Sequence, residues 1–154
     1  MRVLFVCLGN ICRSPTAEGV LRHKLQQAGL AGRVTVDSAG TGAWHVGKAP
    51  DPRTRAAAEQ RGYLLHELRA RQVEAEDFRR FDLILAMDRD NLRELQRLRP
   101  AAGGAELDLF LRRGGLAEHE VPDPYYGGEA GFERVLDMVE LACDRLVAQF
   151  REAL

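Results

Sequence analysis

Apolar runs typical of strands alternate along the chain with segments whose apolar residues recur at helical spacing. The run at residues 3–8, VLFVCL, has no polar alternation, as expected of a strand that is buried on both faces. Later runs also predict strands, and helical patterns separate them. The expected strands are residues 3–8, 33–40, 81–87 and 105–110, and the expected helices are residues 15–28, 51–62, 74–80, 88–98 and 131–150.

Capping residues mark the ends of several helical patterns. Ser14 and Pro15 are suited to the N-cap and the first position of the first helix, and Gly29 is suited to its end. Asp51 and Pro52 have the same relation to the second helix. The last pattern predicts an amphipathic helix that closes the core, with apolar residues at Phe132, Val135, Leu136, Val139, Leu146, Val147 and Phe150.

Strands that alternate with helices predict a single α/β domain over residues 1–154, with a mostly parallel sheet covered by helices on both faces. In such a sheet, the loops from strand to helix emerge at the same carboxyl edge, and ligands bind there. We therefore expect segments that are distant in sequence to meet at this edge. These segments are residues 7–14, 38–50, 87–91 and 111–128.

Composition narrows the class of protein further. The chain has 154 residues, enough for one domain with a core of its own. Its 22 Lys and Arg residues nearly balance its 23 Asp and Glu residues, so we expect no basic field that attracts nucleic acid or an anionic membrane. No apolar stretch reaches the roughly 18–20 residues of a membrane helix, and the N-terminal apolar run is too short for a signal peptide.

Cysteine and histidine usage argues against disulfide and metal frameworks. The three cysteines are an odd number in a chain with its own core, so we expect reduced thiols and a cytoplasmic location. The chain has no C-x-x-C or H-E-x-x-H motif, and its four histidines are scattered in the sequence. We therefore expect neither a metal site nor a cofactor.

The sequence CLGNICRS at residues 7–14, here called the first loop, connects the first strand to the first helix. Several unpaired backbone N–H groups of such a loop point inward at the positive end of the helix dipole, which favours an anion. The loop lacks the Lys-Ser/Thr pair of a nucleotide P-loop, and it has no G-x-G-x-x-G fingerprint. The first loop therefore predicts an anion site that is not a nucleotide site.

Side chains of the first loop add a nucleophile and a cation to this site. Cys7 ends the strand beneath the loop amides, so we expect it to be a thiolate at neutral pH. The loop can curl so that Arg13 returns to the same centre, where its planar guanidinium grips two oxygens of a tetrahedral oxyanion. The Ser14 hydroxyl can donate to the sulfur. A cysteine on a buried strand is more often a packing residue, and Cys143, in the last helix, is assigned to the core.

The segment CLGNICRSPTAEG, residues 7–19, closely resembles the signature loop of the low molecular weight protein tyrosine phosphatases. The resemblance continues through DSAGT at 37–41, Trp44, AMDRDN at 86–91 and PDPYYGG at 122–128. It spans nearly the full chain. It implies one α/β domain with a four-stranded parallel sheet and helices on both faces, in agreement with the strand and helix pattern.

The resemblance also implies an activity. The protein would hydrolyse phosphotyrosine and small aryl phosphates through a cysteinyl-phosphate intermediate, with Cys7 as nucleophile and Arg13 as phosphate clamp. Its substrates would be phosphotyrosine proteins or peptides, and phosphate, vanadate and similar oxyanions would inhibit it. The residues expected to contact substrate or phosphate are Leu8, Gly9, Asn10, Ile11, Cys12, Ser14, Trp44, Tyr125 and Tyr126.

A departing phenoxide or alkoxide needs a proton, and Asp123 is the candidate donor. It lies between Pro122 and Pro124, in a stiff loop expected at the carboxyl edge. A phosphate dianion nearby would favour its protonated form. The resemblance gives Asp123 the same role, and the carboxylate would then act as base toward water. An Asp between prolines is about as often a simple turn former.

Aromatic residues of the predicted edge loops would form the pocket walls. Trp44 and Tyr125 are wall residues by resemblance, and flat rings suit an aromatic phosphoester. Tyr126 either contacts substrate or forms a lid over the core. Cys12 is close enough to Cys7 in the loop to form a disulfide under oxidation, as a reversible off-switch, or it is only a packing thiol.

Other polar residues are expected to support the site. Asn10 tolerates a left-handed backbone and can tie the first loop down, a scaffolding role that the resemblance also gives it. Ser38 could hydrogen-bond Ser14, and Asp88 could orient Arg13. A buried polar network would join His66, Glu18 and Asp37, although a histidine in this context is more often structural or exposed.

Three alternative functions remain at this stage. A thiol-dependent arsenate reductase on the same scaffold needs further cysteines, and residues 80–92 contain none. A phosphocarrier or binding module would hold phosphate on a cysteine without hydrolysis, but Arg13 with Asp123 favours hydrolysis. A phosphoarginine phosphatase of the same family is the third, and the apolar Ile11 weakly favours phosphotyrosine instead.

Overall fold

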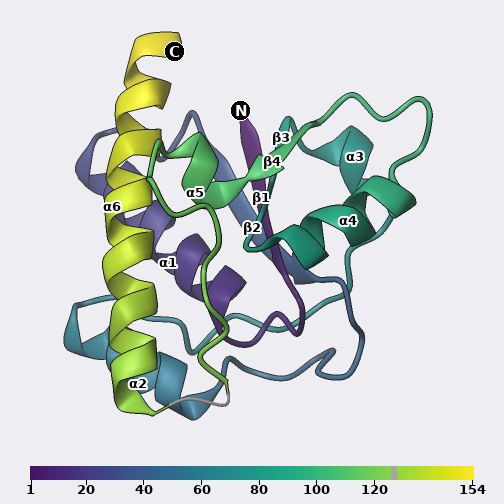
Figure 1. Ribbon diagram of the computed structural model, residues 1–154. Helices are drawn as coiled ribbons and strands as arrows, with labels where there is room; N and C mark the ends of the chain where they lie inside the picture. Colours follow the sequence, from purple (N-terminus) through teal and green to yellow (C-terminus); the bar gives the residue numbers. More distant parts are fainter. Residues whose placement is uncertain (126–127) are drawn as a thin grey trace.

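A four-stranded parallel sheet lies at the centre of the structure, a computed structural model that describes residues 1–125 and 128–154. Its strand order is β2-β1-β3-β4 (Figure 1). The central strand β1 pairs with β2, placing Cys7 opposite Gly40, and with β3, placing Val6 opposite Ala86. The strands are β1 (Arg2–Cys7), β2 (Thr35–Gly40), β3 (Leu83–Ala86) and β4 (Glu106–Leu109). The predicted parallel α/β fold is confirmed.

Helices cover both faces of this sheet (Figure 1). One layer contains α1 (Arg13–Gln27), α2 (Pro52–Gln60), α5 (Phe110–Arg113) and α6 (Glu129–Ala153). The opposite layer contains α3 (Asp77–Arg80) and α4 (Arg89–Leu98). Over residues 1–125 and 128–154, none of these helices is both long enough and apolar enough to cross a membrane.

Alternate side chains of β1 enter two separate cores, which explains its continuous apolar run. Val3 and Phe5 belong to the core beneath α1 and α6, and Phe5 meets the ring of Phe110 edge to face with centroids 4.9 Å apart. Leu4 and Val6 belong to the core beneath α3 and α4. Because β1 is buried on both faces, the end that carries Cys7 is held rigidly at the carboxyl edge of the sheet.

The helix over residues 131–150 is confirmed and runs further, from Glu129 to Ala153. All its predicted core positions are buried, and Ala142 and Cys143 join them. The Cys143 side chain is completely buried, in agreement with its assignment to packing. Burial raises the pKa of this thiol well above the ordinary value.

Helix starts differ from the prediction at the first helix and agree at the second. Helix α1 begins at Arg13, Cys12 is in the N-cap position, and no side chain caps it. The prediction of Ser14 as N-cap is therefore wrong, because its hydroxyl lies 2.9 Å from Cys7 Sγ instead. Helix α2 begins at Pro52 and is capped by Asp51, whose carboxylate accepts from Arg53 N at 2.8 Å, as predicted. The short helix α5 was not predicted.

Candidate active site

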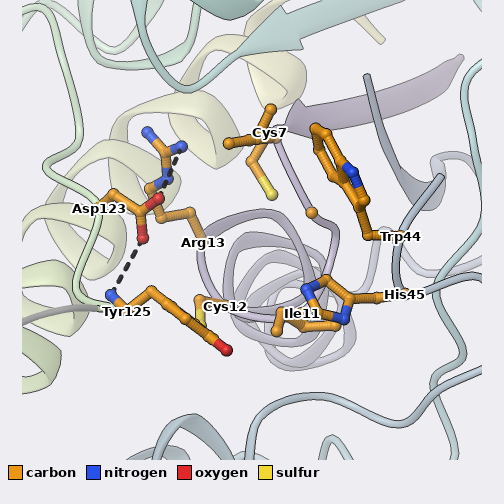
Figure 2. A pocket seen from close by; sticks show the side chains of 10 residues that line it. Cys7, Ile11, Cys12, Arg13, Trp44, His45, Asp123 and Tyr125 are labelled. Carbon is orange, nitrogen blue, oxygen red and sulfur yellow. Dashed lines mark hydrogen bonds and ion pairs between the residues drawn. The ribbon is translucent and has the colours of Figure 1, made fainter. Parts of the chain in front are cut away.

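A pocket of about 460 Å³ opens at the carboxyl end of β1 (Figure 2). The Cys7 sulfur lies in the middle, Arg13 and Asp123 line one side, and Trp44 and His45 line the other (Figure 2). Its size suits a small ligand or one side chain of a larger one. Its residues come from three of the loop segments that were expected to meet, and they are Cys7, Leu8, Gly9, Ile11, Cys12, Arg13, Trp44, His45, Asp123 and Tyr125.

Cys7 ends β1 with its sulfur directed into the first loop. The backbone N–H of Asn10 donates to Cys7 Sγ at 3.2 Å, and Ser14 Oγ lies 2.9 Å from the same sulfur. The 15-residue helix α1 begins beside it and directs its N-terminus toward the loop. Hydrogen bonds and a helix N-terminus both favour a negative charge on sulfur. The Cys7 sulfur therefore lies among groups within hydrogen-bond distance, at the start of a helix.

Arg13 is buried and oriented by two acceptors. Its Nη1 donates to Asp88 Oδ2 at 2.6 Å and to the Val121 carbonyl oxygen at 3.0 Å. Burial opposes its charge, but the neighbouring Cys7, Asp88 and Asp123 outweigh that effect and raise the pKa of Arg13 above its ordinary value. Arg13 is therefore a fixed cation, and Asp88 contacts it as expected.

Asp123 faces Arg13 across the pocket edge, with Oδ2 lying 3.7 Å from Arg13 Nη2. Its Oδ1 accepts from Tyr125 N at 3.0 Å (Figure 2). The loop that carries it is joined to the end of β3 by Val121 N, which donates to the Met87 carbonyl oxygen at 2.8 Å. The carboxyl is partly exposed and so can meet both substrate and solvent.

Aromatic side chains border the opening of the pocket. Trp44 is 69% exposed, and Tyr125 packs at the edge of the main core. His45, which the sequence reasoning missed, lines the pocket beside Trp44, and its ring centroid lies 6.4 Å from that of Tyr125. The only sequence signal for His45 was its place next to Trp44. Tyr126 lies outside the described residues.

Asn10 binds within the first loop and ties it to two other segments. It has the left-handed backbone that was expected, with φ 57°. Its Nδ2 donates to Ser14 Oγ at 2.8 Å and to Ser38 Oγ at 3.0 Å, and its Oδ1 accepts from Arg71 N at 3.0 Å. The expected direct bond between Ser38 and Ser14 is replaced by this bridge, because the side-chain amide of Asn10 has two N–H groups and can donate one to each hydroxyl.

The buried network around Glu18 differs from the prediction. Ser38 Oγ donates to Glu18 Oε1 at 2.7 Å, and Arg22 pairs with Glu18 Oε2 at 2.6 Å. Burial raises the pKa of Glu18, although Ser38 and Arg22 partly offset the effect.

His66 does not belong to this network. Its side chain is 60% exposed, and its nearest acid is the exposed Glu67 at 3.9 Å. Asp37 instead pairs with Arg71 at 3.1 Å, and Arg71 also pairs with the buried Asp77 at 3.0 Å. Permanently charged guanidinium groups supply the cations that these carboxylates need, so the sequence prediction of His66 is wrong.

Cys12 lines the pocket, and both it and Cys7 are free thiols in the structure. Burial raises the pKa of Cys12 to about 12, and the neighbouring Thr54 hydroxyl offsets only part of this effect. Cys12 is therefore a neutral thiol at physiological pH. Among residues 1–125 and 128–154, no cluster of three or more His, Cys, Asp or Glu side chains could hold a metal ion.

A parallel α/β sheet that presents a thiol, a buried arginine and a carboxyl to one anion-binding loop defines a class of protein, the cysteine-dependent phosphoester hydrolases. Sequence comparison narrows the class. The sequence model of the family described as "Low molecular weight phosphotyrosine protein phosphatase" matches residues 2–154. The chain belongs to this family.

Individual relatives are similar to this chain over nearly the full length of both proteins. A low molecular weight protein-tyrosine-phosphatase of Streptomyces coelicolor is 49% identical, with 98% of this chain and 94% of the relative covered. A protein tyrosine phosphatase structure from Entamoeba histolytica has a TM-score of 0.93 at 43% identity, covering 99% of this chain and 98% of its own. A Drosophila structure described as an arginine phosphatase has a TM-score of 0.91 at 34% identity, with 98% of each chain covered.

Proposed function

We propose that the protein hydrolyses phosphotyrosine in proteins or peptides, and small aryl phosphates, through a cysteinyl-phosphate intermediate. The observation that carries the proposal is the meeting of Cys7, Arg13 and Asp123 on the walls of one pocket at the end of β1. Residues 1–154 would act together as one phosphatase domain. No cofactor or metal ion is needed for the steps below.

The first step transfers the phosphoryl group to sulfur. The Cys7 thiolate attacks phosphorus, the bond to the tyrosyl oxygen breaks, and Asp123 gives its proton to that oxygen. Arg13 Nη1 is engaged by Asp88 and Val121, so the Nε and Nη2 side of the guanidinium would grip the phosphate oxygens. A bound dianion would compete with Asp123 for Arg13 Nη2 and so favour the protonated carboxyl.

The second step returns the enzyme to its starting state. The Asp123 carboxylate takes a proton from water, the water oxygen attacks phosphorus, and the bond between phosphorus and sulfur breaks. Inorganic phosphate and the Cys7 thiolate are released, and Ser14 Oγ, 2.9 Å from the sulfur, stabilises the departing thiolate. The amides of the first loop would contact the phosphate, including those of Leu8, Gly9, Ile11 and Cys12.

Pocket walls support an aryl phosphoester as substrate. Trp44 and Tyr125 border the opening, and Ile11 adds an apolar side chain to the lining. Rings on the walls can stack on the phenyl group of phosphotyrosine, a contact that phosphoserine cannot make. Phosphoarginine is the second candidate because of the Drosophila relative.

Two other functions fit the structure less well. A reductase relay would need further cysteines beyond the first loop, but residues 80–92 contain none and Cys143 is completely buried in α6. A phosphocarrier would not need an acid beside the phosphate site, whereas Asp123 lines the pocket. A cytoplasmic location is part of the proposal, since the nucleophile must stay reduced.

The test is phosphate release from a phosphotyrosine peptide, with and without vanadate, and with EDTA present. We expect sustained release that vanadate inhibits and EDTA does not. A phosphoarginine peptide of the same sequence measures the alternative substrate. If neither peptide released phosphate, the proposal would be overturned. A large preference for the phosphoarginine peptide would show that phosphoarginine, and not phosphotyrosine, is the substrate.

A further inference from the structure

Arg53, in the first turn of α2, connects the first loop to the loop that carries Asp123. Its Nε donates to Asp51 Oδ1 at 3.1 Å and its Nη2 to Asp51 Oδ2 at 3.0 Å, a two-point contact with the residue that caps α2. Asp51 N in turn donates to the Ile11 carbonyl oxygen at 2.8 Å. The guanidinium is therefore anchored to the first loop through Asp51.

The other contacts of Arg53 lie on the acid side of the pocket. Its Nη2 also donates to the Tyr125 carbonyl oxygen at 2.9 Å. Its guanidinium carbon lies 5.4 Å from the ring centroid of Tyr125 and 4.9 Å from that of Phe132 in α6, within the range of cation–π contact. One side chain thus fixes both the backbone and the ring of Tyr125.

Tyr125 passes this constraint to the acid. Its backbone N–H donates to Asp123 Oδ1 at 3.0 Å, while its carbonyl is held by Arg53. The other carboxyl oxygen, Oδ2, is left facing Arg13 and the pocket. If Tyr125 were released, the carboxyl of this partly exposed loop would lose the bond that fixes its rotation.

We propose that Arg53 is a positioning residue for the proton donor Asp123: by binding Asp51 and the Tyr125 carbonyl together, it fixes the distance between the acid and the phosphate held by the first loop. The inference rests on the proposed general-acid role of Asp123. A guanidinium is required because one planar group donates to the carboxylate and the carbonyl and also stacks on the ring.

The charge of Asp51 supports this arrangement. Burial opposes ionisation of its carboxyl, but hydrogen bonds from the side chain and the backbone of Arg53 outweigh burial and lower the pKa of Asp51 below its ordinary value. The pair is therefore ionic over the whole physiological range, and Arg53 has a fixed anchor there.

The test uses Arg53→Gln and Arg53→Lys with two substrates that differ in leaving group, 4-nitrophenyl phosphate and phenyl phosphate. The value of kcat/KM covers the steps up to departure of the leaving group, so it reports the proton donation. We expect kcat/KM for phenyl phosphate to fall about 10-fold in Arg53→Gln, since misplacing a catalytic group costs about this much or more. For 4-nitrophenyl phosphate, which leaves readily without a proton, we expect a change below about 3-fold.

Vanadate inhibition separates this role from general damage. The first loop is untouched, so the vanadate inhibition constant should stay within about 2-fold of the wild-type value. Arg53→Lys keeps the charge but loses the planar guanidinium that donates to Asp51 and Tyr125 together. We therefore expect it to recover less than half of the loss in kcat/KM on phenyl phosphate. Arg61→Gln is the matched control: it removes an arginine at the other end of α2, which pairs with Glu133 and Glu140 of α6, and it should not alter the ratio of the two substrates.

Asp123→Asn distinguishes failure of this inference from failure of the proposed function. If Asp123→Asn shows the leaving-group effect and Arg53→Gln loses activity equally on both substrates, or loses none, the positioning role is overturned and the proton donor stands. If Asp123→Asn itself slows both substrates equally, the general-acid role of Asp123 and the positioning role of Arg53 are both overturned. A leaving-group effect in both variants, absent from Arg61→Gln, supports the positioning role.

Discussion

Arg13 illustrates how single side chains set the chemistry of the pocket. It is buried beside three groups that favour its charge, Cys7, Asp88 and Asp123, and it donates a hydrogen bond to Asp88 at 2.6 Å. Asp88 also caps α4, because its Oδ1 accepts from Asn91 N at 2.8 Å. The two carboxylate oxygens therefore have different tasks, and a substitution can separate them.

Asp88→Asn should weaken oxyanion binding with little effect on stability. Asparagine caps helices about as well as aspartate, but it cannot give Arg13 a charged partner. We expect the vanadate inhibition constant and the KM for phosphotyrosine peptide to rise about 10-fold, which corresponds to about 1.4 kcal/mol and is close to the lower end of the roughly 1.5–3 kcal/mol of a hydrogen bond to a charged group. Urea unfolding checks that the free energy of unfolding changes by less than about 1 kcal/mol, and unchanged vanadate affinity would contradict an orienting role for Asp88.

At the scale of elements, α2 depends on its cap. Asp51 accepts from Arg53 N at 2.8 Å, and its pKa lies below the ordinary value. A lowered pKa means that the native state binds fewer protons than the unfolded chain, so the carboxylate stabilises the fold above the unfolded value of about 3.9. This stabilisation is lost as pH falls through the lower native value.

Asp51→Ala should therefore cost about 1 kcal/mol of unfolding free energy at pH 6, the usual cost of losing an N-cap, and less at pH 3. Urea unfolding of wild type and variant at the two pH values measures the difference. Because Asp51 also anchors Arg53, the variant should show the same leaving-group effect as Arg53→Gln. A stability difference that is constant or larger at pH 3 would show that the carboxylate charge does not contribute.

Elements whose burial leaves a clear hydrophobic pattern could be predicted from the sequence, and other elements could not. The continuous apolar run of β1 and the periodic apolar face of α6 identify them, since burial on two faces or on one leaves a direct pattern. The predicted start of α1 was wrong because serine commonly caps helices, whereas the Ser14 hydroxyl contacts Cys7 Sγ instead. Local propensity cannot reveal such a tertiary contact. The one-turn helix α5 is too short to have a period.

The same distinction holds for the site. Cys7, Arg13 and Asp123 occur in short motifs with a known chemical logic, so they could be named from the sequence and are together in the pocket. Arg71 and Arg53 could not be named, because their partners Asp37 and Tyr125 lie 34 and 72 residues away along the chain. An arginine-rich sequence offers many candidates for such contacts, and His66 was chosen wrongly among the polar residues.

On the scale of the whole molecule, both cores hold the carboxyl edge in place. Alternate residues of β1 enter them, and α1 and α6 make extensive contact over the main core. Loss of either core should therefore release the first loop. The proposal of one domain over residues 1–154 then requires that fold and activity disappear together.

Phe5→Ala tests this coupling. The buried ring contacts Phe110, and its removal should cost about 3–5 kcal/mol of unfolding free energy. We expect urea curves followed by far-UV circular dichroism and by phosphatase activity to coincide, and to shift together in the variant. Leu141→Ala, at an exposed apolar position of α6, is the control and should shift neither curve measurably. Activity lost well before the circular dichroism signal would indicate separate units.

The central claim is that Cys7 carries the phosphoryl group between substrate and water. The most direct measurement is rapid acid quench of the enzyme during turnover of phosphotyrosine peptide, followed by mass spectrometry of the N-terminal fragment. We predict phosphate on Cys7 in the wild type, and none in Cys7→Ser, which should still bind vanadate. With 4-nitrophenyl phosphate, whose leaving group departs without a proton, Asp123→Asn should carry more phosphate on Cys7 than the wild type, because only the base for the second step is then missing. Turnover by Cys7→Ser, or phosphate trapped on another residue of a fully active enzyme, would contradict the account.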